Sequence, residues 1–141
     1  MLRKFFPLLL AIILSNSELI SQPGTWRQVG SAGAWVNTLF AAATNGSLYT
    51  IERSGALYKT DPATGSWSQV GNQNYANTTH FFAGNKKLLS IEKDGSLYRT
   101  NPETANWVRL GDAGAWGKTI VGYASYGHLF TADSGGGLYA T

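Results

Sequence analysis

The chain has 141 residues, a formal net charge of +3 at pH 7 and no cysteine. Hydrophobic residues make up 43% of it and charged residues 13%, against about 45–50% and about 25% in typical globular domains. This composition excludes charge-driven disorder and fits a single domain. The lack of cysteine excludes a disulfide framework, a thiolate metal site and a cysteine nucleophile. The 17 Gly, 5 Trp, 7 Tyr and 6 Phe residues favour short strands and tight turns over a helix bundle.

The first residues are typical of a secretory signal peptide. Arg3 and Lys4 precede an apolar run at 5–14, and small polar residues follow that run. The run has about half the length of a membrane-spanning helix, so a membrane anchor is the weaker interpretation. We predict a signal peptide at 1–21, a mature chain at 22–141, and a secreted or periplasmic protein with no membrane span.

The charge of the mature chain argues against nucleic acid as a partner. Removing the signal peptide turns 11 basic residues into 9 and 8 acidic residues into 7, which leaves a net charge of +2. Proteins that bind duplexes instead present a basic stripe to the phosphates. The sequence therefore predicts no nucleic-acid partner.

One sequence unit is written three times in the mature chain, with a period of 40–41 residues. Each copy begins with a Trp, an aliphatic residue and a Gly, at 26–30 (WRQVG), 67–71 (WSQVG) and 107–111 (WVRLG). An aromatic residue near a turn follows in each copy, namely Trp35, Tyr75 and Trp116. An acid comes next in each copy, namely Glu52, Glu92 and Asp133. A Leu-Tyr pair then follows, at 57–58, 97–98 and 138–139. A fixed period of this kind is the signature of a repeat architecture.

Turn signals divide each copy into four short strands. In the first copy we predict strands at 37–44, 47–53, 56–61 and 66–71, separated by Gly-containing turns. Four strands in about 40 residues are the size of a propeller blade, and the long 3.6-period runs of helical repeats are absent. The sequence therefore predicts an all-β fold, a β-propeller built from three four-stranded blades. Each Leu-Tyr pair places apolar surface on both faces of its strand, so we expect both faces to be buried.

The frame of the repeat predicts how the blades are completed. The mature chain opens with the last strand of a blade, around Trp26, and the third blade lacks its outer strand at Thr141. Propellers have about four to eight blades, so three blades cannot close a ring. Our hypothesis is a homodimer in which two chains form a six-bladed ring and each Trp26 strand completes the partner's third blade. The alternative is that the sequence is a fragment of a larger propeller.

The repeat resembles that of tachylectin-type β-propeller lectins and is similar to tectonin repeats. The resemblance is carried by 29–35 (VGSAGAW), 45–51 (NGSLYTI), 55–59 (GALYK) and Trp67, and it extends over 26–141. It implies a secreted lectin that binds N-acetylated or other sugars at several equivalent sites between or beside the blades, without catalysis.

The turn aromatics, each with the polar residue two positions further on, are the candidate ligand-binding residues. A sugar ring stacks its apolar face on an aromatic ring, while its hydroxyls need amide or charged partners. Residues two apart in an extended chain project to the same side. The alternative is that the aromatic packs between blades and the Asn satisfies the turn backbone. The candidates are Trp35 with Asn37, Tyr75 with Asn77, and Trp116 with Lys118.

The other recurring residues are assigned to structure. We expect the Trp residues that begin the copies to pack within the blades. The recurring acids are interpreted as turn acids, with the alternative that they line a common channel.

Enzyme motifs are missing. His80 and His128 occupy non-equivalent repeat positions without metal-ligand spacing, there is no nucleophile elbow, and nothing indicates a cofactor. Two alternatives stay open: a hydrolase that uses Glu52 and Glu92 as paired carboxylates, and a non-catalytic protein-interaction scaffold.

Overall fold

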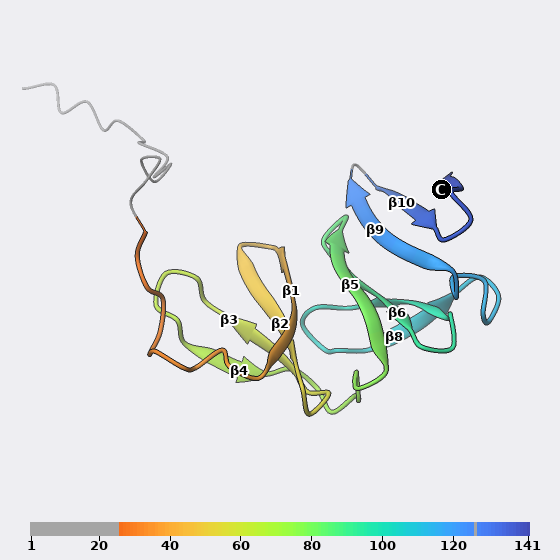
Figure 1. The fold of residues 1–141 in the computed structure, drawn as a ribbon. Coiled ribbons are helices and arrows are strands. Elements are labelled where there is room, and N and C mark those ends of the chain that lie inside the picture. Colours follow the sequence, from red (N-terminus) through yellow and green to blue (C-terminus); the bar gives the residue numbers. More distant parts are fainter. Residues whose placement is uncertain (1–25, 126) are drawn as a thin grey trace, which may run out of the picture.

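The computed structural model describes residues 26–125 and 127–141, so the predicted signal peptide lies outside the described residues. These residues form eleven β-strands in three antiparallel sheets (Figure 1). In the described part of the chain, no helix is long and apolar enough to cross a membrane.

Each sheet is a meander that corresponds to one sequence repeat. The first blade contains β1 (Thr38–Thr44), β2 (Ser47–Glu52), β3 (Leu57–Thr60) and β4 (Trp67–Gln69). The second blade contains β5 (Thr78–Gly84), β6 (Lys87–Glu92), β7 (Leu97–Thr100) and β8 (Trp107–Leu110). The third blade contains β9 (Thr119–Ser125), β10 (His128–Asp133) and β11 (Leu138–Ala140). The predicted all-β class and the blade meanders are confirmed, and the third blade has three strands among the described residues.

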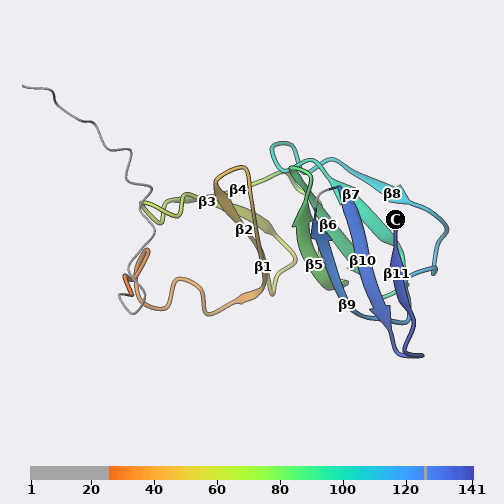
Figure 2. The ribbon, with the colours of Figure 1, turned by 90° about the horizontal axis from the view of Figure 1, so that it is seen from above.

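The blades stack face to face, with β1, β5 and β9 side by side as the innermost strands (Figures 1 and 2). One core cluster lies between the first and second blades, where Ile51 and Leu57 pack with Tyr75 and Leu88. A second cluster between the second and third blades is formed by Phe82, Leu89, Ile91, Leu97 and Leu129. Alternate strand residues point to opposite faces, and the apolar residues at both parities of β6 therefore serve both clusters.

A glycine turn joins each blade to the next. Gly55, in the turn between β2 and β3, has a φ of +85°, and its carbonyl accepts the backbone N–H of Tyr75 at 2.8 Å. A Cβ on Gly55 would lie 2.2 Å from the Oδ1 of Asn74, so only glycine permits this approach. The second joint repeats the first, with the N–H of Trp116 donating to the carbonyl of Gly95 at 2.9 Å.

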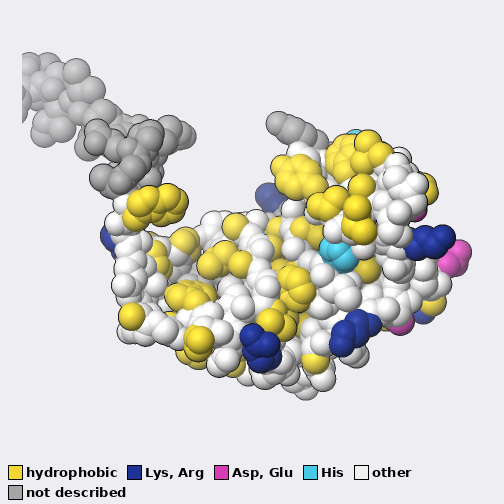
Figure 3. Space-filling model, in the orientation of Figure 1, with side chains coloured by type: hydrophobic (Ala, Val, Ile, Leu, Met, Phe, Trp, Pro, Cys, Tyr) yellow, Lys and Arg dark blue, Asp and Glu magenta, His cyan; other side chains and the backbone are white. Residues whose placement is uncertain are grey.

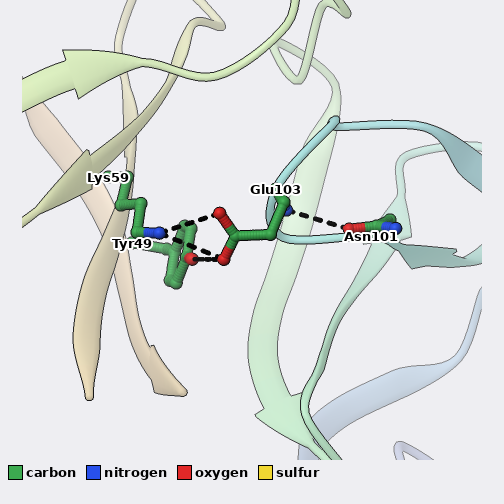
Figure 4. Close-up of polar contacts among 4 residues, drawn as sticks. All are labelled: Tyr49, Lys59, Asn101 and Glu103. Carbon is green, nitrogen blue, oxygen red and sulfur yellow. Dashed lines mark hydrogen bonds and ion pairs between the residues drawn. The ribbon is translucent and has the colours of Figure 1, made fainter. Parts of the chain in front are cut away.

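An ion pair also links the first two blades (Figure 4). The loop before β8 extends Glu103 toward the first blade, where the Nζ of Lys59 lies 2.9 Å from its carboxylate. The hydroxyl of Tyr49 donates to the same carboxylate at 3.3 Å, and the Oδ1 of Asn101 accepts the backbone N–H of Glu103 at 2.9 Å. The hydrogen bond from Lys59 holds the pKa of Glu103 below its ordinary value. These contacts connect the periphery of the two blades.

Two sequence expectations fail at the margins of the described chain. Residues 26–29 form no strand, because no described segment pairs with them, and unpaired backbone groups do not make a ladder. Trp26 is 99% exposed and therefore does not pack as expected. In the third blade, Leu138 and Tyr139 are both exposed. The expected burial of both strand faces therefore holds in the second blade, which has a blade on each side, and does not hold on the outer faces of the first and third blades.

Candidate functional site

A cavity of about 440 Å³ lies on the face of the first blade that points away from the second blade. We call it the first-blade pocket. The turn before β1 contributes Trp35 and Asn37, and the blade contributes one wall from β2, β3 and β4. The complete lining is Ala34, Trp35, Asn37, Thr50, Glu52, Arg53, Ser54, Tyr58, Thr60 and Trp67.

Aromatic rings form much of this pocket. Trp67 lies edge-on to Tyr58, with ring centroids 4.7 Å apart, and Trp67 is 57% exposed. The Nε1 of Trp35 donates to the carbonyl of Val29 at 3.3 Å. Because this bond occupies the polar atom of the indole, Trp35 offers the pocket apolar ring surface. Three aromatic side chains thus line one cavity.

Polar groups in the pocket retain hydrogen-bonding capacity. The Oε1 of Glu52 accepts the hydroxyl of Thr38 at 2.6 Å, and Arg53 is exposed at the rim. Thr50 and Thr60 are each 1% exposed, and their Oγ1 atoms have no hydrogen-bond partner among the described residues. An unpaired buried hydroxyl costs about 1–3 kcal/mol. The wall therefore offers a carboxylate and a guanidinium to a polar ligand, while the two threonine hydroxyls are buried beneath its surface.

The equivalent position in the second blade is closed by its own side chains. Trp107 packs between two tyrosines, with ring centroids 5.1 Å from Tyr75 and 4.7 Å from Tyr98. Tyr75 is 1% exposed, and its hydroxyl lies 3.5 Å from both the Oγ1 of Thr100 and the carbonyl of Ala105. Tyr75 is therefore a core residue in this structure, and a ligand does not reach its ring.

The acid of the second blade shares the environment of that core. Glu92 is 8% exposed, and its Oε1 accepts the hydroxyl of Thr78 at 2.8 Å. This contact repeats the one between Glu52 and Thr38. Burial raises the pKa of the Glu92 carboxyl above its ordinary value of 4.5. Glu92 is thus a buried hydrogen-bonded acid, whereas Glu52 lines an open pocket.

The third blade has a pocket of about 460 Å³ at the same repeat position. Its lining includes Trp116, Lys118, Asp133 and Tyr139, the equivalents of Trp35, Asn37, Glu52 and Tyr58. Asp133 accepts the backbone N–H groups of Gly135 and Gly137 at 3.0 and 2.8 Å, and the bond from Gly137 is the main cause that lowers its pKa. Asp133 therefore acts as the turn acid that the sequence indicates. Asp133 has a shorter side chain than Glu52, and its carboxylate is hydrogen-bonded to the turn. The third-blade pocket therefore offers a ligand less free acceptor capacity than the first-blade pocket.

The structure divides the candidate residues into two groups. Trp35 with Asn37, and Trp116 with Lys118, line open pockets, whereas Tyr75 is buried and Asn77 is exposed beside it. Sequence reasoning missed the residues that the strands supply to the first-blade pocket, namely Thr50, Glu52, Arg53, Tyr58, Thr60 and Trp67. The sequence signal for them is the alternation of side chains between the two faces of a strand. Thr50 pairs with Tyr58 and Thr60 pairs with Trp67 across the sheet, so these residues share one face.

Acidic and histidine side chains do not gather into larger groups among the described residues. No group of three or more His, Asp or Glu side chains there could hold a metal ion. The wall of the first-blade pocket includes Glu52 and does not include Glu92.

Comparison with solved structures shows the fold. The chain is similar to a catalytically inactive variant of virginiamycin B lyase from Staphylococcus aureus solved with quinupristin, with a TM-score of 0.52 and 13% identity over 86% of this chain and 46% of that chain. It is also similar to PorZ, a bacterial surface component of the type-IX secretion system of Porphyromonas gingivalis, with a TM-score of 0.44 and 14% identity over 72% of this chain and 15% of that chain. This chain thus spans less than half the length of either protein.

No family model and no curated protein matches the chain. The comparisons therefore establish the fold of this chain and assign it to no family. The chain is an all-β protein made of β-propeller blades.

Proposed function

We propose that this protein is a secreted, non-catalytic carbohydrate-binding protein whose principal site is the first-blade pocket. The observation that carries the proposal is the combination of aromatic and polar groups in one open cavity. Trp35, Tyr58 and Trp67 supply ring surface, while Glu52 and Arg53 stand beside them. Sugars combine an apolar C–H face with hydroxyls, and this combination matches both kinds of wall.

The charged groups of the pocket support a ligand rich in hydrogen-bonding groups. Arg53 is exposed at the rim, and Glu52 lines the same cavity. A hydrogen bond to a charged group contributes about 1.5–3 kcal/mol, so sugar hydroxyls or an acetamido group would gain from both side chains. The resemblance of the repeat to tachylectin-type and tectonin-like sequences favours N-acetylated sugars among the candidates.

Multivalency follows from the repeat if the third-blade pocket binds the same ligand class. Two weak sites on one body raise apparent affinity on a surface that displays many copies of the sugar, by about 10²–10⁴-fold when geometry allows both to engage. Trp116 and Lys118 are the residues proposed for the second site. The differences between the two linings predict that it is the weaker one.

A glycan array probed with the purified chain tests the proposal. We expect density-dependent binding to one sugar class that millimolar free sugar competes. The matched pair is Glu52→Gln and Glu92→Gln, the same change at equivalent positions. Glu52→Gln, in the open pocket, should lower affinity about tenfold, since a hydrogen bond to a charged group contributes about 1.5–3 kcal/mol, whereas Glu92→Gln should leave binding unchanged.

The same experiment has outcomes that overturn the proposal. A folded chain that binds no glycan would exclude a lectin. A protein partner that binds irrespective of free sugar would favour the interaction scaffold. Release of reducing sugar from a bound glycan, lost in the Glu92→Gln variant, would favour a hydrolase.

A further inference from the structure

A backbone hydrogen bond to a turn glycine joins one blade to the next. The donor and acceptor meet at two boundaries, and a third donor and a third acceptor are present but lie apart. Tyr75 and Trp116 each donate a backbone N–H to the turn glycine of the preceding blade. The third blade has the same turn, because Gly136 has a φ of +83°, close to that of the other two. Among the described residues, no backbone N–H donates to the carbonyl of Gly136, and the N–H of Trp35 has no backbone acceptor. These two halves have the chemistry of a third joint.

Residues 26–30 lie where the outer strand of a preceding blade would lie. At the boundary of the first two blades, the end of β4 approaches the loop before β8, so that a Cβ on Gly71 would lie 2.5 Å from the Cβ of Ala105. At the first blade, a Cβ on Gly65 would lie 2.6 Å from the backbone nitrogen of Gly30. Gly65 and Ala105 are equivalent, as are Gly30 and Gly71. The first described residues thus lie beside the first blade in the position of an outer strand, without forming one.

The aromatic pair of the outer strand is separated in the same way. In both complete blades the Trp of the outer strand lies 4.7 Å from the Tyr of the third strand, measured between ring centroids. Tyr139 is the equivalent Tyr in the third blade, where it is 54% exposed. Trp26 is the equivalent Trp, and it is 99% exposed. Each ring lacks the partner that the other provides.

The outer face of the third blade has the character of a face that packs on another blade. Its exposed apolar side chains come from β9, β10 and β11, and Figure 3 shows hydrophobic side chains gathered over β9 and β10. They are Val121, Tyr123, Phe130 and Leu138. The equivalents of Tyr123, Phe130 and Leu138 in the second blade are buried against the third, namely Phe82, Leu89 and Leu97. The complementary surface is the free face of a first blade. That face is equivalent to the face with which the second blade packs on the first.

The two halves of this contact cannot meet within one chain in this arrangement, because residues 26–30 and the third blade lie at opposite tips of the molecule (Figure 1). We propose that a second copy of this chain is the partner. The third blade of each copy docks on the first blade of the other, and residues 26–29 add to β11 as a fourth strand. Two copies give six blades, within the propeller range of about four to eight, and the contact closes with two-fold symmetry.

Docking and an open ligand pocket are compatible. Trp116 packs in the cluster between the second and third blades and still lines an open pocket. The assembly therefore goes beyond the proposed carbohydrate binding and does not require it.

The complete blades fix the register of the added strand. In the first blade Thr60 pairs with Trp67 and Lys59 with Ser68, and the second blade repeats this pairing. Transferred to the third blade, the register pairs Thr141 with Trp26 and Ala140 with Arg27 of the second copy. A shift by one residue would turn every side chain to the other face.

Single cysteines test this register in a chain that has none of its own. We would mix full chains that carry Arg27→Cys with chains that carry Ala140→Cys, oxidise them and identify disulfides by mass spectrometry. Paired strand positions are about 5 Å apart, whereas positions offset by two are about 7–8 Å apart, beyond the reach of a disulfide. We expect the mixed disulfide to form and the control pair Arg27→Cys with Leu138→Cys to remain reduced. Equal yields for both pairs, or no mixed disulfide, would overturn the register.

Sedimentation analysis tests the assembly itself. We expect a dimer, and Trp26→Ala should raise its dissociation constant at least tenfold, because aromatic pairs contribute about a factor of ten each. Trp26 is fully exposed in one copy, so this change leaves the fold of the chain intact. Val108→Ala, an exposed apolar residue on a complete blade, is the matched control and should have no effect.

The outcomes separate this inference from the proposed function. A monomer that binds sugar would overturn the assembly and leave the lectin in place. A dimer that binds no sugar would do the reverse. A dimer unaffected by Trp26→Ala would overturn the strand exchange.

Discussion

The first and second blades carry equivalent residues in two different arrangements. In the second blade, Trp107 lies between Tyr75 and Tyr98 and closes the position. In the first blade, Trp67 lies edge-on to Tyr58, and a cavity of about 440 Å³ remains in front of Trp35. Repeats that are alike in sequence thus differ in whether a ligand has access to them.

The difference has a physical cause in the side chains that pack around the turn aromatic residue. Tyr75 lies in the cluster that includes Ile51 and Leu57 of the first blade, so its ring is enclosed on both sides. Filling such a space removes apolar surface from water, which stabilises the fold by about 25 cal/mol per Å². No described blade lies in front of Trp35. Tyr75 is thus enclosed by the first blade and by Trp107 of its own blade, whereas Trp35 lines a pocket. Trp116 packs against the second blade and also lines a pocket, so contact with a preceding blade does not close the position by itself.

The largest expected effect comes from truncating the turn aromatic residue in each of the two blades. One truncation should reduce stability and the other should reduce glycan binding. Tyr75→Ala should lower the free energy of unfolding by about 3–5 kcal/mol, the usual cost of truncating a buried aromatic residue. Trp35→Ala should abolish glycan binding with a smaller loss of stability. The test is to measure thermal unfolding and glycan binding for both variants. If Trp35→Ala unfolded the chain as readily as Tyr75→Ala, the two positions would be equivalent after all.

A smaller effect is expected from the buried acid of the second blade. Because burial raises the pKa of Glu92 above 4.5, the folded state binds this proton more tightly than the unfolded state. The resulting stability is fully present below pH 4.5 and is lost as pH rises through the raised pKa. Glu92→Gln stays neutral and keeps an acceptor for Thr78. The variant should lose less stability above pH 4.5 and unfold at a higher temperature near pH 7, and parallel pH profiles of the two proteins would contradict this.

The smallest expected effect concerns the ion pair between the blades. Glu103→Gln removes the charge that faces Lys59 at 2.9 Å, and surface ion pairs contribute little because water and salt screen them. We expect a slight decrease in Tm at low salt and no difference at high salt. A large decrease that persists in salt would mean that the loop with Ala105 depends on Glu103 for its packing.

Strand positions were the most predictable part of this protein. The four strands predicted in the first copy agree with β1 to β4 within a few residues, because turn glycines mark strand ends by local backbone chemistry. Gly55 is one example, since its positive φ is required whatever surrounds it. Trp26 is the counterexample. Its sequence is that of an outer strand, but a strand forms only where another strand supplies hydrogen-bond partners.

The ligand pocket was predictable in part. Trp35 and Asn37 line it, as the turn aromatic and its polar neighbour indicate, but the sequence assigns Glu52 to a turn and Trp67 to packing within the blade. Their convergence depends on cross-strand pairing, which brings together residues more than 15 positions apart in the sequence.

The sequence by itself determined the three repeats, the blade meanders and the turn glycines, since these depend on local periodicity and backbone conformation. Only the tertiary structure decided which of the equivalent aromatic positions is open. That choice depends on which side chains pack around the ring, as the first blade and Trp107 do around Tyr75, and repeats with similar residues can differ in this packing.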